Sequence, residues 1–340
     1  MTSSSTSKVK KFFVLCIDKK YSTNEFVNIL EKEYLGIINY EFMGATPLSI
    51  VAVSGRFPER LDLLIKFGAN INQRIENSGL TALNISCCWC SYSSVLLLVN
   101  KGVDINISDL QGRTPLINAT IHGSTKILSF LLEKKAVINN FDILGFSATH
   151  LACMLGMTAC LNILIENQVN ILIPNDLTGM MSIHFAAAYG YIDCIIILIK
   201  NGFVDINLLD INNKTPLDTA ILFRKIDVVK FLLEQNAKCS FTIDDIILKK
   251  DKILNNKDTV NKLKNIKNVS KRSTFCYNEC DKKDVDNLKI CSRCKIATYC
   301  CNECQQSHWM KHKKVCIKIP NKIRELTNKE KQLINFLEKS

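Results

Sequence analysis

The chain has 340 residues, of which 47% are hydrophobic and 22% charged, and it carries a formal net charge of +12. This balance allows a buried core and excludes a globally disordered protein. The charge is uneven: residues 246–340 hold 23 Lys and Arg against 10 Asp and Glu, a net of +13, which leaves −1 for the first 245. A solvated basic linker is the interpretation we favour, and attraction of nucleic acid, anionic membrane or acidic proteins is the alternative.

The amino-terminal end lacks the apolar run of a signal peptide, since only residues 12–17 form a short apolar block. We therefore expect neither export nor a transmembrane segment. Sixteen cysteines in such a chain indicate reduced thiols and metal ligands, whereas a disulfide framework would need an exported protein. We expect a cytoplasmic protein, with the nucleus or the cilium as the alternative locations.

Residues 1–39 combine a polar tail with apolar residues at helical spacing, such as Phe12, Leu15, Phe26 and Leu30. This pattern predicts two helices, which form either a cap or a degenerate repeat unit.

A short motif then recurs through residues 40–242. It reads Thr46-Pro-Leu, Thr81-Ala-Leu, Thr114-Pro-Leu, Ser147-Ala-Thr, Met181-Ser-Ile and Thr215-Pro-Leu, at intervals of 35, 33, 33, 34 and 34 residues. A threonine followed by proline starts a helix, because the hydroxyl caps free N–H groups and proline fits the first turn. Each motif leads into a turn and a second helix with an aliphatic stripe. We predict about six helix pairs that bury their apolar faces by stacking.

These motifs and their period resemble the ankyrin-repeat family, which implies a mainly α solenoid that binds another protein through its fingertips and its concave helix face. At four fingertips the residue after an aspartate is apolar. We predict an exposed stripe that binds a partner protein; the alternative is isolated surface residues in a sequence rich in Ile and Leu. The stripe residues are Leu110, Ile143, Leu177 and Ile211.

Other reactive side chains in the repeats have structural explanations. Cys87, Cys88 and Cys90 lack a fourth ligand nearby in the sequence, so we predict small buried thiols rather than a metal site. In the ankyrin family, the histidine position occupied by His150 and His184 usually hydrogen-bonds neighbouring loops.

Eight cysteines and two histidines gather within residues 276–316. Four close pairs supply eight soft ligands, which is the requirement of two tetrahedral zinc sites. The pairs are Cys276/Cys280, Cys291/Cys294, Cys300/Cys304 and His312/Cys316. His308 is an alternative to His312, and Cys301 is a spare thiol.

The stretch resembles a MYND-type zinc finger in Cys291-Ser-Arg-Cys294, Tyr299-Cys300, Cys304-Gln305, His308-Trp309 and His312-Lys-Lys-Val-Cys316. The resemblance implies interleaved ligands: Cys276, Cys280, Cys300 and Cys304 for one zinc, and Cys291, Cys294, His312 and Cys316 for the other. The first pair departs from the family's C-x2-C spacing by one residue.

The same resemblance implies a groove that binds short peptides containing proline and leucine, lined by Ser292, Gln305 and Trp309. The alternative for Trp309 is packing in the core of the finger. Both zinc sites would be closed, and the sequence contains no P-loop, dinucleotide turn or nucleophile elbow, so we expect no enzyme.

Residues 243–272 are expected to cap the array and form a basic linker, and residues 321–340 to form an amphipathic helix that packs on the finger or binds a partner. The whole sequence therefore predicts a zinc-binding adaptor with two protein-binding surfaces. The alternative is a nuclear transcriptional co-regulator with its basic tail near nucleic acid.

Overall fold

The computed structural model describes residues 3–200 and 204–239, together with the strand residues 289–290 and 298–299. Two compact units divide the chain: one holds the described residues 3–143, and the other holds those from residue 144 onward. None of the helices in these described ranges is long and apolar enough to cross a bilayer.

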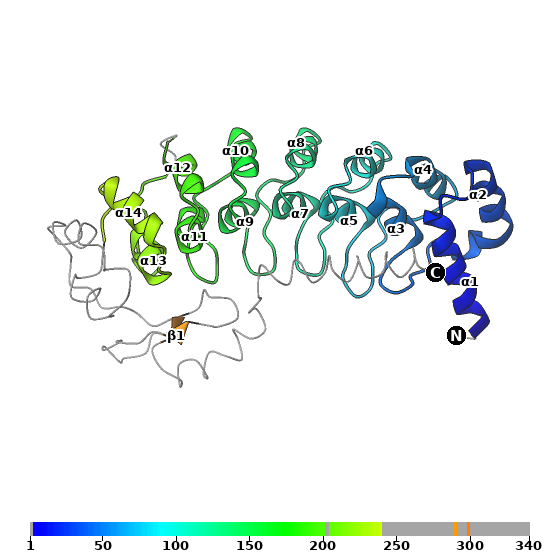
Figure 1. Ribbon diagram of the computed structural model, residues 1–340, viewed down its shortest axis with the longest axis horizontal. Helices are drawn as coiled ribbons and strands as arrows, with labels where there is room; N and C mark the ends of the chain where they lie inside the picture. Colours follow the sequence, from blue (N-terminus) through cyan, green and yellow to red (C-terminus); the bar gives the residue numbers. More distant parts are fainter. Residues whose placement is uncertain (1–2, 201–203, 240–288, 291–297, 300–340) are drawn as a thin grey trace. The chain divides into compact units, whose positions relative to one another are not determined.

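The first unit contains three helix pairs preceded by two further helices (Figure 1). α3 packs against both α1 and α5, and α2 packs against α4. α1 and α2 therefore extend the two rows of helices as a degenerate pair, which agrees with the two helices predicted before residue 40. The elements are α1 Ser3–Ile17, α2 Thr23–Ile29, η1 Leu30–Tyr34, η2 Leu35–Ile37, α3 Pro47–Ser54, α4 Pro58–Lys66, α5 Ala82–Cys88, α6 Tyr92–Asn100, α7 Pro115–Ile121 and α8 Thr125–Glu133.

The second unit repeats the same design with three more pairs (Figure 1). α11 packs between α9 and α13, and α12 packs between α10 and α14. The predicted mainly α fold of stacked helix pairs is thus confirmed. The elements are α9 Ala148–Leu155, α10 Thr158–Glu166, α11 Ser182–Tyr189, α12 Ile192–Lys200, α13 Pro216–Leu222, α14 Ile226–Glu234, β1 Lys289–Ile290 and β2 Thr298–Tyr299.

The inner helix of each pair begins where the recurring motif predicts. The Thr46 Oγ1 atom accepts a hydrogen bond from the Ser49 N–H at 3.1 Å, and Thr215 caps α13 in the same way at 3.1 Å. These bonds satisfy N–H groups that have no partner within the helix. Met181 has no side-chain oxygen, so the His184 N–H donates to the Met181 carbonyl oxygen at 2.9 Å, and the Nδ1 atom of His184 accepts the Met181 N–H at 3.3 Å.

The outer helix of each pair carries the predicted aliphatic stripe. Two side chains three residues apart are buried in all six outer helices, with exposed fractions of 0–1%. Burial of one such side chain contributes roughly 1.5–3 kcal/mol, so stacking is what stabilises these short helices. The pairs are Leu61/Leu64, Val95/Leu98, Leu128/Leu131, Leu161/Leu164, Ile195/Leu198 and Val229/Leu232.

Asparagines at the ends of repeats form a second link between neighbouring repeats. The Oδ1 atom of Asn72 accepts the Asp104 N–H at 3.0 Å, and Asn106 accepts the Val137 N–H at 2.9 Å. Further along, Asn207 accepts the Lys238 N–H. In the second unit, the segment 169–172 reads Val-Asn-Ile-Leu, so leucine occupies the asparagine position.

Replacing this leucine is expected to stabilise the protein. Leu172 is 49% exposed, and a Leu172→Asn side chain would add an acceptor for the Asp205 N–H, which holds the register of Asp104. One added hydrogen bond should raise the free energy of unfolding by about 1 kcal/mol, measured by urea denaturation followed by circular dichroism. The matched control is Leu209→Asn, since Leu209 is 47% exposed but lies outside this register. Equal effects of the two changes would contradict the expectation.

Candidate protein-binding and zinc sites

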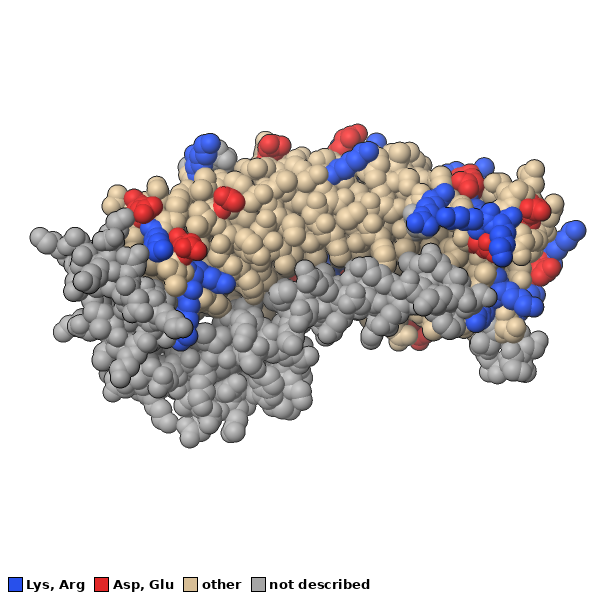
Figure 2. Space-filling model, viewed as in Figure 1, with Lys and Arg blue, Asp and Glu red and all other residues tan. Residues whose placement is uncertain are grey.

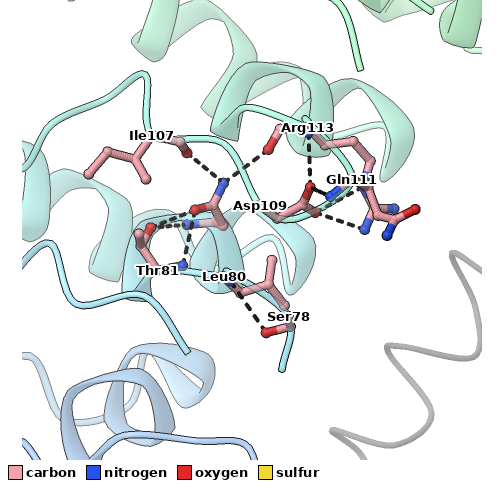
Figure 3. Close-up of polar contacts among 8 residues, drawn as sticks. Ser78, Leu80, Thr81, Ile107, Asp109, Gln111 and Arg113 are labelled. Carbon is pink, nitrogen blue, oxygen red and sulfur yellow. Dashed lines mark hydrogen bonds and ion pairs between the residues drawn. The ribbon is translucent and has the colours of Figure 1, made fainter. Parts of the chain in front are cut away.

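The fingertip at Asp109 is held rigid by one buried carboxylate. Its Oδ1 atom accepts the N–H groups of Gln111 at 2.8 Å and Arg113 at 2.9 Å. Its Oδ2 atom accepts from the Arg113 guanidinium, with the Nε atom at 2.9 Å and the Nη2 atom at 2.8 Å (Figure 3). Charge-assisted bonds of this kind are stronger than neutral ones, so the tip is fixed before any partner arrives.

Asn84 ties both sides of this finger to the start of α5. Its Oδ1 atom accepts the Thr81 N–H at 3.1 Å. Its Nδ2 atom donates to the carbonyl oxygens of Ile107 at 3.2 Å and Arg113 at 3.4 Å (Figure 3). The sequence analysis missed this residue, although its place three residues after Thr81, matching that of His150 after Ser147, was a usable signal.

In the second unit, His150 and His184 tie the start of an inner helix to the neighbouring finger, as Asn84 does in the first unit. The Nε2 atom of His184 lies 3.1 Å from the Leu208 carbonyl oxygen and 3.0 Å from that of Lys214. The Nε2 atom of His150 lies 3.0 Å from the Ile173 carbonyl oxygen. The predicted bonds to neighbouring loops are therefore confirmed. Burial lowers the pKa of each ring from 6.5 to about 4, because the charged form would lose its hydration.

Leu110 and Ile143 occupy successive fingertips of the first unit, with exposed fractions of 52% and 56%. The Leu110 N–H donates to the Ser78 carbonyl oxygen, and the Ile143 N–H donates to that of Gln111, each at 2.9 Å. A glycine lies beneath each contact: a Cβ atom on Gly112, for example, would come within 2.8 Å of the Ile143 nitrogen. These two tips thus expose apolar side chains, and backbone hydrogen bonds connect each tip to the preceding finger.

The last fingertip of the second unit follows the same plan. The Asp210 Oδ1 atom accepts the N–H groups of Asn212 and Lys214, both at 2.8 Å. Ile211 lies against Gly179 of the preceding finger and is 67% exposed, the largest exposed fraction among the large apolar side chains of the described residues.

The predicted register is wrong at the remaining tip. Asn175, and not Asp176, takes the place of Asp109: it is fully buried, and its Oδ1 atom accepts from the N–H groups of Leu177 at 3.0 Å and Thr178 at 3.1 Å. The turn is one residue longer, because the Asn175 N–H pairs with residue 180 five positions on. Asp176 therefore holds the place of Leu110, and Leu177 is half-buried. A carboxylate interrupts the apolar series.

The cysteines near Trp89 are not uniformly buried. Cys87 is buried as predicted, whereas Cys88 is half-buried and Cys90 is exposed. Cys90 lies in the turn after α5 with a φ of 54°, and its Sγ atom is 3.8 Å from the His122 carbonyl oxygen. In the described ranges, no three side chains of the metal-binding types come together to hold an ion.

The predicted zinc ligands and the predicted groove residues Ser292, Gln305 and Trp309 lie outside the described residues. The two short strands between them are described: β1 and β2 pair antiparallel, with Ile290 opposite Thr298. The strands end just before Cys291 and Cys300. Because Lys289 lies opposite Tyr299, β1 ends at the turn of the hairpin and β2 ends at its open end. Seven thiolates and an imidazole in four pairs suit closed tetrahedral zinc, which supplies folding energy and leaves no position for a substrate.

Comparison with known families agrees with both parts of this design. The model of ankyrin repeats matches three times, at residues 15–109, 106–175 and 167–243, which together cover more than half of the chain. The model of the MYND finger matches residues 276–316, the bounds predicted from the cysteine spacing. A MYND finger implies bound zinc.

Curated relatives share only part of their length with this chain. An E3 ubiquitin-protein ligase, XBAT32, from Arabidopsis thaliana is 30% identical over 171 residues, covering 48% of this chain and 31% of the relative. The mouse B-cell lymphoma 3 protein homolog is 29% identical over 137 residues, covering 36% and 31%. Inversin from Canis lupus familiaris is 31% identical over 134 residues, covering 39% and 12%. The chain thus spans less than a third of these relatives, and by the ankyrin matches along its own length it belongs to the ankyrin-repeat family, with a MYND finger near its carboxyl end.

Proposed function

We propose that this protein is an adaptor that holds one protein on its ankyrin fingertips and a second, through a peptide containing proline and leucine, on its MYND finger. The observation that carries the proposal is the exposure of large apolar side chains at three fingertips, Leu110, Ile143 and Ile211. Exposed apolar side chains held on a rigid backbone favour protein binding. The proposal gives the chain no catalytic activity of its own.

The rigidity of the fingers supports this role. The carboxylates of Asp109 and Asp210 close their turns from within, and Asn84 and His184 fasten the same two fingers to the starts of α5 and α11. Little conformational entropy is then lost when a partner binds. Two binding modules on one chain raise the effective concentration of one partner near the other.

Affinity capture with matched variants of the full chain tests the fingertip surface. The variant Leu110→Gln/Ile143→Gln/Ile211→Gln should lose a set of proteins that the unchanged chain retains. The control Tyr21→Gln/Leu35→Gln/Leu96→Gln also changes three exposed large hydrophobic residues, but away from the fingertips, and should keep that set. Thermal unfolding of both variants separates lost binding from lost folding. Equal capture by both variants would reject the fingertip surface.

A peptide-binding assay tests the finger separately. Full-length protein is titrated into fluorescent peptides that contain proline and leucine, and anisotropy gives the affinity. Trp309→Ala should weaken binding at least about fivefold, since loss of an aromatic anchor costs more than about 1 kcal/mol, while the fingertip variant should bind unchanged. Unchanged affinity of Trp309→Ala would reject the groove and leave the fingertip result standing.

A further inference from the structure

Two neighbouring fingers of the second unit, residues 171–180 and 205–214, form a surface with an unusual combination of side chains. Three aliphatic residues are exposed there: Leu172 by 49%, Leu209 by 47% and Ile211 by 67%. We call these two fingers the acidic-apolar surface, because the carboxylates of Asp176 and Asp205 are exposed on them as well.

The acidic-apolar surface holds one basic residue, the half-buried Lys214, against the exposed carboxylates of Asp176 and Asp205. Residues 136–199 contain no Lys or Arg, although they contain four acidic residues. In Figure 2 the charged side chains in view over α9 and α10 are acidic, whereas basic side chains are in view beside α13. Both histidines of this stretch are neutral near pH 7, because burial lowers the pKa of each ring to about 4. The surface therefore attracts a segment that is both basic and aliphatic.

The two fingers are also fixed relative to each other. Ile211 lies against Gly179 of the preceding finger. His184, at the start of α11, bonds the carbonyl oxygens of Leu208 and Lys214 at the two sides of the second finger. A surface that is already ordered needs little reorganisation to bind a segment.

The chain itself supplies a segment of matching chemistry. Residues 249–272 hold nine Lys and Arg against two Asp, and they include six aliphatic residues. They begin ten residues after Cys239, the last described residue of the array, and ten extended residues span about 33 Å. A tether of this length gives an effective concentration on the order of millimolar. The aliphatic residues are Ile253, Leu254, Val260, Leu263, Ile266 and Val269.

We propose that residues 249–272 dock on the acidic-apolar surface of the same chain. The docked segment covers Ile211, and its lysines are withheld from nucleic acid and other anionic partners. Such partners and a fingertip-binding protein would then compete with the same contact. The contact does not depend on the proposed adaptor role, because it is made within one chain.

Carbodiimide cross-linking of the full chain, read by mass spectrometry, tests the contact directly. The expected products join Asp176 or Asp205 to lysines between residues 249 and 271. Deuterium uptake by residues 249–272 in the first seconds should be slower than in the isolated synthetic peptide. Experiments at several protein concentrations, with mixed light and heavy chains, distinguish contact within one chain from contact between two copies; cross-links formed only between copies would overturn the proposal.

A charge-reversal pair provides the matched control. Asp176→Lys/Asp205→Lys should speed deuterium uptake by residues 249–272 about tenfold. Glu166→Lys/Asp193→Lys makes the same charge change at exposed positions on α10 and α12 and should leave the uptake unchanged. Full uptake in the unmodified chain, or equal effects of the two variants, would overturn the docking. If Asp176→Lys/Asp205→Lys lost partner capture without any change in deuterium uptake by residues 249–272, the docking would be overturned, and the loss would bear only on the proposed binding of a partner at the fingertips.

Discussion

Lowering the pH from 7 to 4.5 is expected to destabilise the second unit by several kcal/mol through two buried histidines. His150 and His184 have pKa values lowered from 6.5 to about 4. A lowered folded-state pKa means that the neutral ring stabilises the fold fully above pH 6.5, and that this stabilisation is lost as the pH falls toward 4. At pH 4.5 the loss is on the order of 2–3 kcal/mol for each ring.

The hydrogen bonds give the physical cause of this sensitivity. The Nδ1 atom of His150 accepts the Ser147 N–H at 3.1 Å, and that of His184 accepts the Met181 N–H at 3.3 Å. The proton of each neutral ring therefore lies on the Nε2 atom and is donated to a carbonyl oxygen. A second proton on Nδ1 would face a backbone N–H in a buried site, so protonation breaks a cap and charges the interior.

The array contains its own non-titrating substitute for these rings. Asn84 makes equivalent bonds to Thr81, Ile107 and Arg113 in the first unit. We therefore expect His150→Asn/His184→Asn to fold, and to lose about 5 kcal/mol less than the unchanged chain between pH 7 and 4.5, measured by urea denaturation.

Asp210 has the opposite effect on stability as the pH falls, since burial raises its pKa. Because both the variant and the unchanged chain retain Asp210, its effect cancels in the comparison. Parallel pH profiles of the variant and the unchanged chain would contradict the role of the histidines.

The helix pairs could be predicted from the sequence because their signals are local. The hydroxyl of Thr46 or Thr215 caps its helix by accepting the N–H of the residue three positions later, and proline at the next position fixes the first turn. The buried aliphatic pair occupies the same positions in each outer helix, since each pair must pack against the matching pair of the neighbouring helix. The stacking of similar helix pairs therefore produces a regular repeat in the sequence, from which the fold can be predicted.

The fingertips were less predictable because their geometry depends on choices between adjacent turn-forming residues. Asn175 and Asp176 are both able to close an Asx turn, and the pattern of an aspartate followed by an apolar residue predicted the wrong one. The longer turn is recognised only from the pairing of residues 175 and 180. The exposed position of Cys90 depends likewise on a left-handed turn without glycine, for which the sequence gives no clear signal.

Removal of zinc is expected to unfold the finger and leave the ankyrin array intact. Structural zinc contributes roughly 10–16 kcal/mol to the folding of small zinc-binding peptides, more than a domain of this size can replace. Native mass spectrometry of the full chain should find two zinc ions, and a chelator should remove them with little loss of helical circular dichroism. Cys291→Ser should lose one zinc, whereas the control Cys301→Ser should keep both. Loss of zinc from Cys301→Ser would contradict the predicted ligands.

Pairs of substitutions decide whether the ligands interleave. If the first and third pairs share a metal, Cys276→Ser/Cys300→Ser damages a single site and should leave one zinc per chain. Cys276→Ser/Cys291→Ser then damages both sites and should leave none. If consecutive pairs shared a metal, the two results would be exchanged, because Cys276 and Cys291 would belong to one site. Interleaving is the expected outcome, since the antiparallel strands β1 and β2 end at opposite ends of the hairpin, which suits two ligand pairs that serve different metals.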